Sequence, residues 1–213
     1  WRWMPVASPS RSRGLERDIL LYNRLVPALE ALCRHHFNEI GCHGWEHVQR
    51  VRALSRRIGL EEGAVLEILD LAALFHDSKR DEDDHAIRSA EYAEAVLRSE
   101  GFSEAFLKAV CDAISSHSYT CGRVPQSLEA KVLSDADRLD AMGAIGIYRT
   151  VQYNLEKGYT AARVAEHISE KLLRLSEGMH TATGRRMARE REAILRLYMD
   201  SLLSELRASS SST

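Results

Sequence analysis

Helical periodicity of apolar residues runs through most of the chain and limits the folds open to it. The sequence contains only four prolines and few β-branched runs, and no stretch alternates like a strand for long enough to suggest a sheet. Glycines fall near the ends of several periodic segments, as expected for helix C-termini. We therefore predict an all-α bundle with helices over 15–38, 44–59, 62–77, 85–100, 103–117, 126–142, 143–156, 160–176 and 182–206.

The length of 213 residues suits one domain with a substantial core. We expect residues 1–14 to form a disordered extension, because this stretch is rich in Arg and Ser. Residues 15–206 form the predicted domain. Residues 207–213 are expected to be a disordered, low-complexity tail.

Charge and hydropathy exclude two classes of partner. Charged residues make up 28% of the chain, but the net charge is only −2, which does not indicate general nucleic-acid binding. No apolar run approaches the roughly 20 residues of a membrane span, so we expect no membrane partner.

The cysteines Cys33, Cys42, Cys111 and Cys121 form no CxxC pair. Together with the lack of a recognisable secretory signal, this favours reduced thiols in a cytoplasmic protein. If the Arg- and Ser-rich start is the remnant of a transit peptide, an organelle is the alternative location.

Four side chains in three places have the chemistry of a metal site. His47 lies in one predicted helix, His76 and Asp77 close the apolar run 71–75, and Asp137 lies in a third helix. Two imidazoles and two carboxylates are enough to hold a divalent ion. Consecutive residues point about 100° apart within a helix, so His76 and Asp77 share one ion only at a helix end. The charged segment that begins at Ser78 predicts that end.

The order H…HD…D resembles the HD superfamily of metal-dependent phosphohydrolases. The contexts HxxRV at 47–51, LFHD at 74–77 and SDADRLDA at 134–141 are similar to that family. The pattern TxxGRxxAxxR at 181–191 resembles the last helix of small stand-alone HD hydrolases, which extends the resemblance over residues 20–206. Arg50 is expected to pair with an acid of the helical scaffold. His43 is expected either to line the pocket or to be exposed.

The resemblance implies one divalent metal, and a mixed imidazole and carboxylate set suits Mn, Fe, Co, Ni, Zn or Mg. In HD proteins with two metals, two further histidines follow the HD pair. His85 and His117 have similar contexts here, and with Asp77 bridging they would complete a second site. The connection from Asp77 to His85 is shorter than expected for that type. The alternative is that His117 contacts the substrate phosphate and His85 only starts a helix.

Cations near these ligands are candidates for holding phosphoryl oxygens. Arg80 and Lys79 follow the HD pair, and Arg138 follows Asp137. Alarmone hydrolases have HDxxED and cyclic-dinucleotide phosphodiesterases have HDxGK, and Arg80 departs from both patterns. The implied mechanism is metal-assisted hydrolysis, in which Asp77 orients the attacking water and His117 or an acid of 81–84 moves protons.

The expected substrate is a nucleotide or another small phosphate ester or anhydride, and the narrower expectation is a nucleotidase or a nucleotide pyrophosphohydrolase. Two other functions stay open. One is a di-iron HD-type oxygenase, and the other is a non-catalytic module that binds a nucleotide or a partner. A homodimer is a further expectation.

Overall fold

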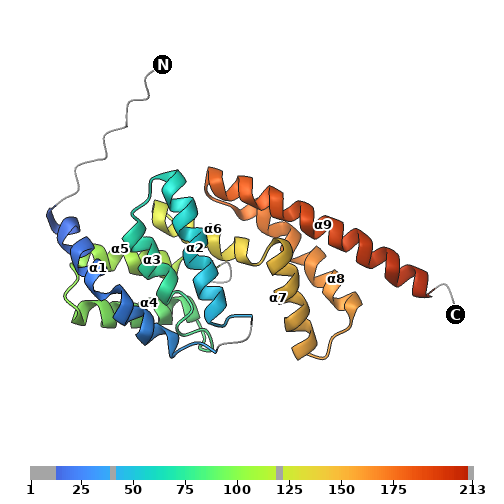
Figure 1. Cartoon of the computed structure of the whole chain (residues 1–213), viewed down its shortest axis with the longest axis horizontal. Coiled ribbons are helices and arrows are strands. Elements are labelled where there is room, and N and C mark those ends of the chain that lie inside the picture. The colour runs from blue at the N-terminus through green and yellow to red at the C-terminus, as the bar shows by residue number, and fades with distance from the viewer. Residues whose placement is uncertain (1–12, 39–41, 119–121, 211–213) are drawn as a thin grey trace, which may run out of the picture.

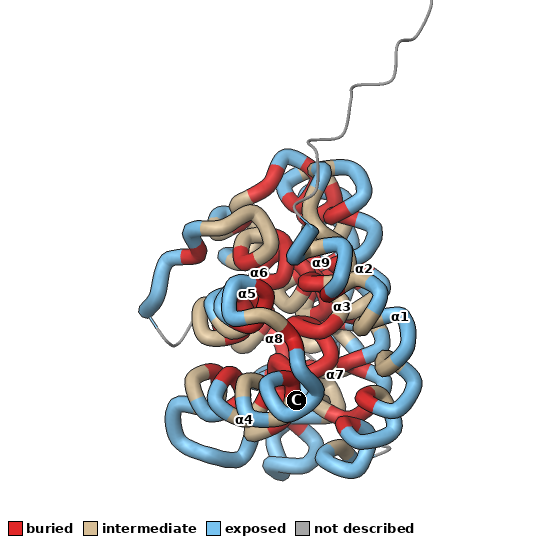
Figure 2. The backbone as a smooth tube through the Cα atoms, turned by 90° about the vertical axis from the view of Figure 1, so that its left-hand side faces the viewer, coloured by how far each residue is buried: buried red, intermediate tan, exposed pale blue. Residues whose placement is uncertain are grey.

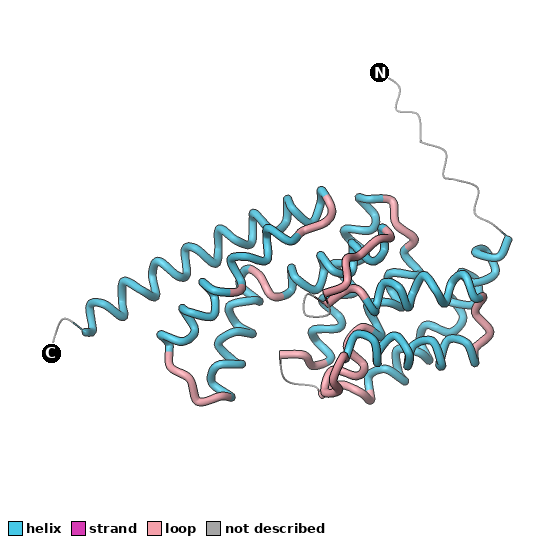
Figure 3. The backbone as a smooth tube through the Cα atoms, turned by 180° about the vertical axis from the view of Figure 1, so that it is seen from behind, coloured by secondary structure: helices cyan, strands magenta, loops and turns pink. Residues whose placement is uncertain are grey.

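The structure is a computed structural model that describes residues 13–38, 42–118 and 122–210. These residues form nine α-helices and one 3-10 helix, with no strand among them, which confirms the all-α prediction (Figure 3). The elements are α1 (Arg13–Arg34), α2 (Trp45–Glu62), α3 (Leu66–Phe75), α4 (His85–Ser99), α5 (Glu104–Ser115), α6 (Leu128–Asp140), α7 (Gly143–Glu156), α8 (Ala161–Glu170), η2 (Leu172–Gly178) and α9 (Ala182–Ser210).

The helix α2 passes through Gly59, where we expected it to end, and stops instead at Gly63, which has a left-handed backbone with φ 80°. Gly59 has a packing role inside the helix, because a Cβ atom there would collide with Leu69 Cδ1 of α3. A glycine can therefore mark close contact between helices as well as a helix end.

Two other boundaries differ from the expected spans. The predicted helix 160–176 is divided into α8 and η2 at Lys171, whose φ of −120° and ψ of −58° are not helical. The helix α9 continues to Ser210, into the segment expected as a tail. Part of the gap predicted between the helices 15–38 and 44–59, residues 39–41, lies outside the described residues.

The core is centred on α3, an almost entirely apolar helix. Figure 2 shows buried backbone gathered around it, with exposed segments outside. A helix that is apolar on all sides requires cover on all sides, and α1, α2, α5 and α6 pack against it. Its buried side chains are Ile68, Leu69, Leu71, Ala72, Ala73, Leu74 and Phe75.

Asp70, the polar residue in the middle of α3, ties three helices together. Its carboxylate accepts two hydrogen bonds from Arg52 of α2, at 2.9 and 2.8 Å, and one from the Tyr22 hydroxyl of α1, at 2.9 Å. A two-pronged guanidinium–carboxylate pair fixes direction as well as distance. This network joins α1, α2 and α3 through one carboxylate.

Figure 1 shows α7, α8 and α9 at one end of the molecule and α1 to α5 at the other, with α6 between them. Side chains cap two of these helices: Ser103 accepts from the Phe106 amide at the start of α5, and Thr181 accepts from the Gly184 amide at the start of α9. None of the helices in the described ranges has the length and apolar character needed to cross a membrane.

Candidate metal centre

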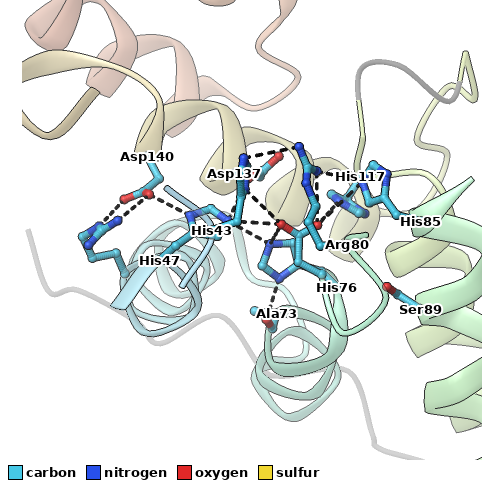
Figure 4. Close-up of polar contacts among 12 residues, drawn as sticks. His43, His47, Ala73, His76, Arg80, His85, Ser89, His117, Asp137 and Asp140 are labelled. Atoms are coloured by element: carbon cyan, nitrogen blue, oxygen red, sulfur yellow. Dashed lines mark hydrogen bonds and ion pairs between the residues drawn. The ribbon is translucent and has the colours of Figure 1, made fainter. Parts of the chain in front are cut away.

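Three separate elements bring the predicted ligands together. His47 projects from α2, His76 follows the last residue of α3, and Asp137 lies on α6 (Figure 4). The His47 Nε2 atom lies 3.2 Å from His76 Nε2 and 3.5 Å from an Asp137 oxygen. Two donors that share an ion at about 2.1 Å each lie no more than about 4.2 Å apart. The donor set and its spacing therefore fit a divalent metal.

Asp77 is placed by the turn that ends α3. The backbone of His76 is still helical, with φ −54° and ψ −36°, and the chain then leaves the helix in a series of turns. One Asp77 oxygen, Oδ2, lies 3.7 Å from His47 Nε2 and 3.8 Å from His76 Nε2. The predicted helix end thus lets both members of the HD pair face one point.

Each of three histidines has its Nδ1 atom occupied. His47 Nδ1 lies 2.8 Å from Asp140 Oδ2, and the other two rings donate to the carbonyl oxygens three residues earlier, at 2.8 Å for His76 and 2.6 Å for His117. A proton on Nδ1 leaves the lone pair on Nε2. All three Nε2 atoms point into the cluster, which is the orientation that metal ligands would need.

Asp140 contacts the Nδ1 side of His47, away from the cluster, and also accepts hydrogen bonds from two arginines. It is buried and also accepts from Arg50 at 2.7 Å and from Arg149 of α7 at 2.6 Å. Burial alone raises the pKa of Asp140, but the hydrogen bonds from His47 and Arg50 outweigh it and hold that pKa far below its usual range. The predicted pairing of Arg50 with a scaffold acid is confirmed.

A second pair of histidines faces the other oxygen of Asp77. Asp77 Oδ1 lies 3.6 Å from Nε2 of His85, the first residue of α4, and 3.7 Å from Nε2 of His117. The His117 ring lies 5.1 Å from the His76 ring and 5.7 Å from the His85 ring, centre to centre. Asp77 therefore stands between two histidine pairs with one oxygen toward each.

The protonation states of His76 and Asp77 suit metal binding, whereas His117 is shifted toward its protonated form. Burial lowers the pKa of His76 to about 4, which keeps this ring neutral at ordinary pH. Burial raises the pKa of Asp77, but attraction to His76, when that ring is protonated, and contact with His117 hold it well below its usual range. Burial also lowers the pKa of His117, but interaction with Asp77 outweighs burial, so that this pKa is raised and the ring must lose its proton before it can bind a metal. Neutral imidazole and ionised carboxylate are the forms that bind metals.

Arg80 lies over the cluster and bridges its two sides. One guanidinium nitrogen is 3.4 Å from Asp77 Oδ1 and 3.0 Å from His85 Nε2, and the other is 3.3 Å from His43 Nε2. His43 in turn lies 3.3 Å from Asp77 Oδ2. His43 was expected either to line the pocket or to be exposed, and the structure places it beside Asp77 and Arg80.

The other two candidate cations lie farther from the cluster. Lys79 pairs with Glu82 at 3.3 Å and lies over the Tyr92 ring at 5.4 Å. Arg138 donates to the Gly178 carbonyl and lies 3.0 Å from His180 Nε2, so it links α6 to the start of α9. Of the three cations predicted to contact phosphate, Arg80 is the one whose described contacts reach Asp77 and His85.

A cavity of about 490 Å³ opens beside this cluster, and His43, Asp77, Lys79 and Arg80 line its inner end. The cluster is thus reachable by a small molecule, and a cation stands where the molecule would meet Asp77. A concave site of this size is typical of small-molecule binding.

The roles of Asp140 and Arg149 were missed from sequence. Asp140 follows Asp137 by three residues, which places both on one face of α6, so its spacing was a usable signal. Arg149 comes from a different helix, and no local pattern connects it to the site.

Comparison with known proteins places these observations in a family. The HD domain model matches residues 44–142, which include His47, His76, Asp77, His85, His117 and Asp137. The chain is 34% identical over 176 residues to YpgQ of Bacillus subtilis, covering 78% of this chain and 85% of YpgQ.

Solved structures agree with this match. The crystal structure of Bacillus subtilis YpgQ in complex with ADP is 30% identical, with a TM-score of 0.70 over 84% of this chain and 96% of that one. A predicted HD superfamily hydrolase from an uncultured Thermotogales bacterium is 31% identical, with a TM-score of 0.66 over 85% and 93% of the two chains. An HD-superfamily hydrolase from Bacillus thuringiensis is 28% identical, with a TM-score of 0.72 over 88% and 99%. These likenesses and the donor cluster support a metal-dependent hydrolase, and the chain belongs to the HD-domain family.

Proposed function

We propose that the protein hydrolyses phosphate ester or anhydride bonds of nucleotides with the help of one or two divalent ions. The observation that carries the proposal is the position of Arg80, a cation held over a cluster of metal donors at the inner end of a cavity. Phosphoryl transfer depends on positive charge at the nonbridging oxygens, and a guanidinium can hold two of them.

The protein's own residues supply orientation and charge. His47, His76, Asp77 and Asp137 would hold a first ion, and His85 and His117 would hold a second with Asp77 between the two. When bound, a divalent ion lowers the pKa of water and polarises a phosphoryl oxygen. Arg80 faces the incoming phosphate, and Asp77 presents a carboxylate that can orient the attacking water. If a single ion binds, His117 is instead free to transfer protons.

Nucleotides are the proposed substrates because the relative YpgQ forms a complex with ADP. Nucleotidase and nucleotide pyrophosphohydrolase activities differ in their products. The test is to incubate the protein with Mn²⁺ and a panel of nucleoside mono-, di- and triphosphates and to separate the products. Pyrophosphate and a monophosphate formed from triphosphates identify a pyrophosphohydrolase, and phosphate and a nucleoside formed from monophosphates identify a nucleotidase. No release from any member of the panel, with metal bound, would contradict the proposal.

A di-iron oxygenase is the second candidate, favoured by the two histidine pairs on either side of Asp77. Two irons per chain with oxygen-dependent turnover and no phosphate release would support it. Arg80 weighs toward hydrolysis, because a guanidinium over the donors suits an anionic substrate.

A further inference from the structure

The cavity beside Asp77 continues to a second group of side chains that hydrolysis itself does not require. At about 490 Å³ it is far larger than one phosphate group. Its outer end is formed by residues that follow α1 and by the last turn of α7, which are far apart in sequence. The side chains there are His36, Phe37, Asn38, Tyr153, Glu156 and Lys157.

Two aromatic rings at this outer end are held by neighbours. Phe37 is half-buried and packs against Trp45, with ring centres 6.0 Å apart. Tyr153 is 41% exposed, and its ring meets His167 edge-on at 5.7 Å. Lys157 Nζ lies 6.0 Å from the centre of the Tyr153 ring. Rings fixed in this way offer a flat surface for stacking at little entropic cost.

Polar groups at the same end are available for hydrogen bonds. Within the described part of the chain, no side-chain hydrogen bond or ion pair engages Asn38 or Glu156. The Asn38 amide both donates and accepts, and the Glu156 carboxylate accepts. A nucleobase edge carries donors and acceptors, and a ribose carries hydroxyl donors.

We propose that the outer end binds the nucleoside of the substrate, with the base against Tyr153 and Phe37 and with Asn38 and Glu156 as hydrogen-bond partners. This inference rests on the proposed function and extends it, because it makes the aromatic and polar residues of the outer end the determinants of nucleotide preference. The phosphates then lie at the inner end, beside Arg80 and Asp77.

The test compares two ligands in which a methylene group replaces the anhydride oxygen between the two phosphorus atoms and which differ by adenosine. These are α,β-methylene-ADP and methylenediphosphonate, titrated calorimetrically into the full chain with Mg²⁺. We expect the wild-type protein to bind the nucleotide analogue at least tenfold more tightly. Because stacking of a base on an aromatic ring is worth roughly a tenfold change in affinity or more, Tyr153→Ala should weaken binding of the analogue about tenfold. Binding of methylenediphosphonate should not change.

Two further variants separate base binding from general damage. Tyr153→Phe keeps the ring and should bind like wild type. Tyr148→Ala removes another tyrosine of α7, which is 62% exposed and does not line the cavity, and it should also bind like wild type. Equal affinity of the wild-type protein for both ligands, or equal weakening of both by Tyr153→Ala, would overturn the inference. Neither result bears on phosphate release from the nucleotide panel, so the two proposals fail separately.

Discussion

Asp135, Asp137 and Asp140 lie close together on α6 but face different neighbours, because each residue turns the helix by about 100°. Asp137 faces the histidine cluster, and Asp140 lies behind His47 on the same face. Asp135 points the other way, toward the backbone amides of His180 and Thr181. The sequence motif thus contains one proposed ligand, one orienting acid and one structural acid.

We predict that Asp140→Asn weakens metal binding roughly 10- to 100-fold, the usual effect of altering the group that orients a ligating histidine. The amide has lost the charge that holds His47, Arg50 and Arg149. Metal affinity is measured by competition with a chromogenic chelator. The matched control is Asp112→Asn, an exposed acid of α5 paired with Lys108. Equal affinity of Asp140→Asn and wild type would show that His47 needs no orienting partner.

Arg80→Ala should lower kcat/KM for a nucleotide by roughly 10²-fold, the scale found when one group that stabilises transition-state charge is removed. Arg88→Ala is the control, because Arg88 is an exposed arginine nearby in sequence that pairs with Glu91. A wild-type kcat/KM for Arg80→Ala would show that Arg80 does not stabilise the phosphate in the transition state. Metal content should be equal in both variants.

Much of the site could be predicted from residues alone. His47, His76, Asp77 and Asp137 stand in motif contexts, and the structure brings them together. His85 and His117 also lie within reach of Asp77, although their role as ligands stays a prediction. Arg138 was expected at the phosphate because it follows Asp137. Helix geometry turns it about 100° away, toward Gly178, and adjacency in sequence does not reveal that.

At the scale of elements, the start of α9 depends on an acid of α6. Asp135 is fully buried and accepts three hydrogen bonds, from the amides of His180 and Thr181 at 2.8 Å and from the Thr181 hydroxyl at 2.7 Å. These bonds satisfy backbone donors at and before the first turn of α9, which have no partner within the helix. The contact fixes α9 against the domain from within the same helix that supplies Asp137.

Asp135→Ala should therefore lower the free energy of unfolding by about 2–4 kcal/mol, because it leaves buried donors without an acceptor. Urea denaturation followed by circular dichroism measures the change. Asp200→Ala, at an exposed position of α9, should change stability by less than about 0.5 kcal/mol. If the two variants were equally stable, Asp135 would not anchor α9.

Some helix boundaries could not be predicted from the sequence pattern. The positions of α4, α5 and α7 are close to expectation, because Gly101 and Gly158 follow α4 and α7 and Ser103 caps α5. No glycine or proline marks the break between α8 and η2. The residue at the break is Lys171, and lysine favours helices. Packing of η2 against α9 and α6 accompanies this break, and such tertiary contacts override local preference.

At the scale of the whole molecule, the proposed metal centre connects the two ends of the structure. Its residues come from α2, α6 and the segments around α3, α4 and α5, and Arg149 of α7 reaches Asp140. An ion held by several elements binds the folded chain in preference to the unfolded one, so metal binding should stabilise the entire fold.

The homodimer stays a prediction, which sedimentation analysis tests.

Removal of metal should lower the melting temperature. An ion present at 100 times its Kd adds about 2.7 kcal/mol, which corresponds to a rise in Tm of roughly 5–10 °C for a chain of this size. Differential scanning calorimetry with Mn²⁺ or with a chelator measures the shift. His76→Ala should lose most of it. An identical Tm with and without metal in the wild-type protein would speak against the centre.

The most direct test of the account follows phosphate or pyrophosphate release while Mn²⁺ is titrated into protein stripped by a chelator. We predict no release from the stripped protein and a rise that saturates at one or two ions per chain. Asp77→Ala, shown to be folded by circular dichroism, should stay inactive at every metal concentration. Full release by the stripped protein, or a wild-type rate for Asp77→Ala, would contradict the account.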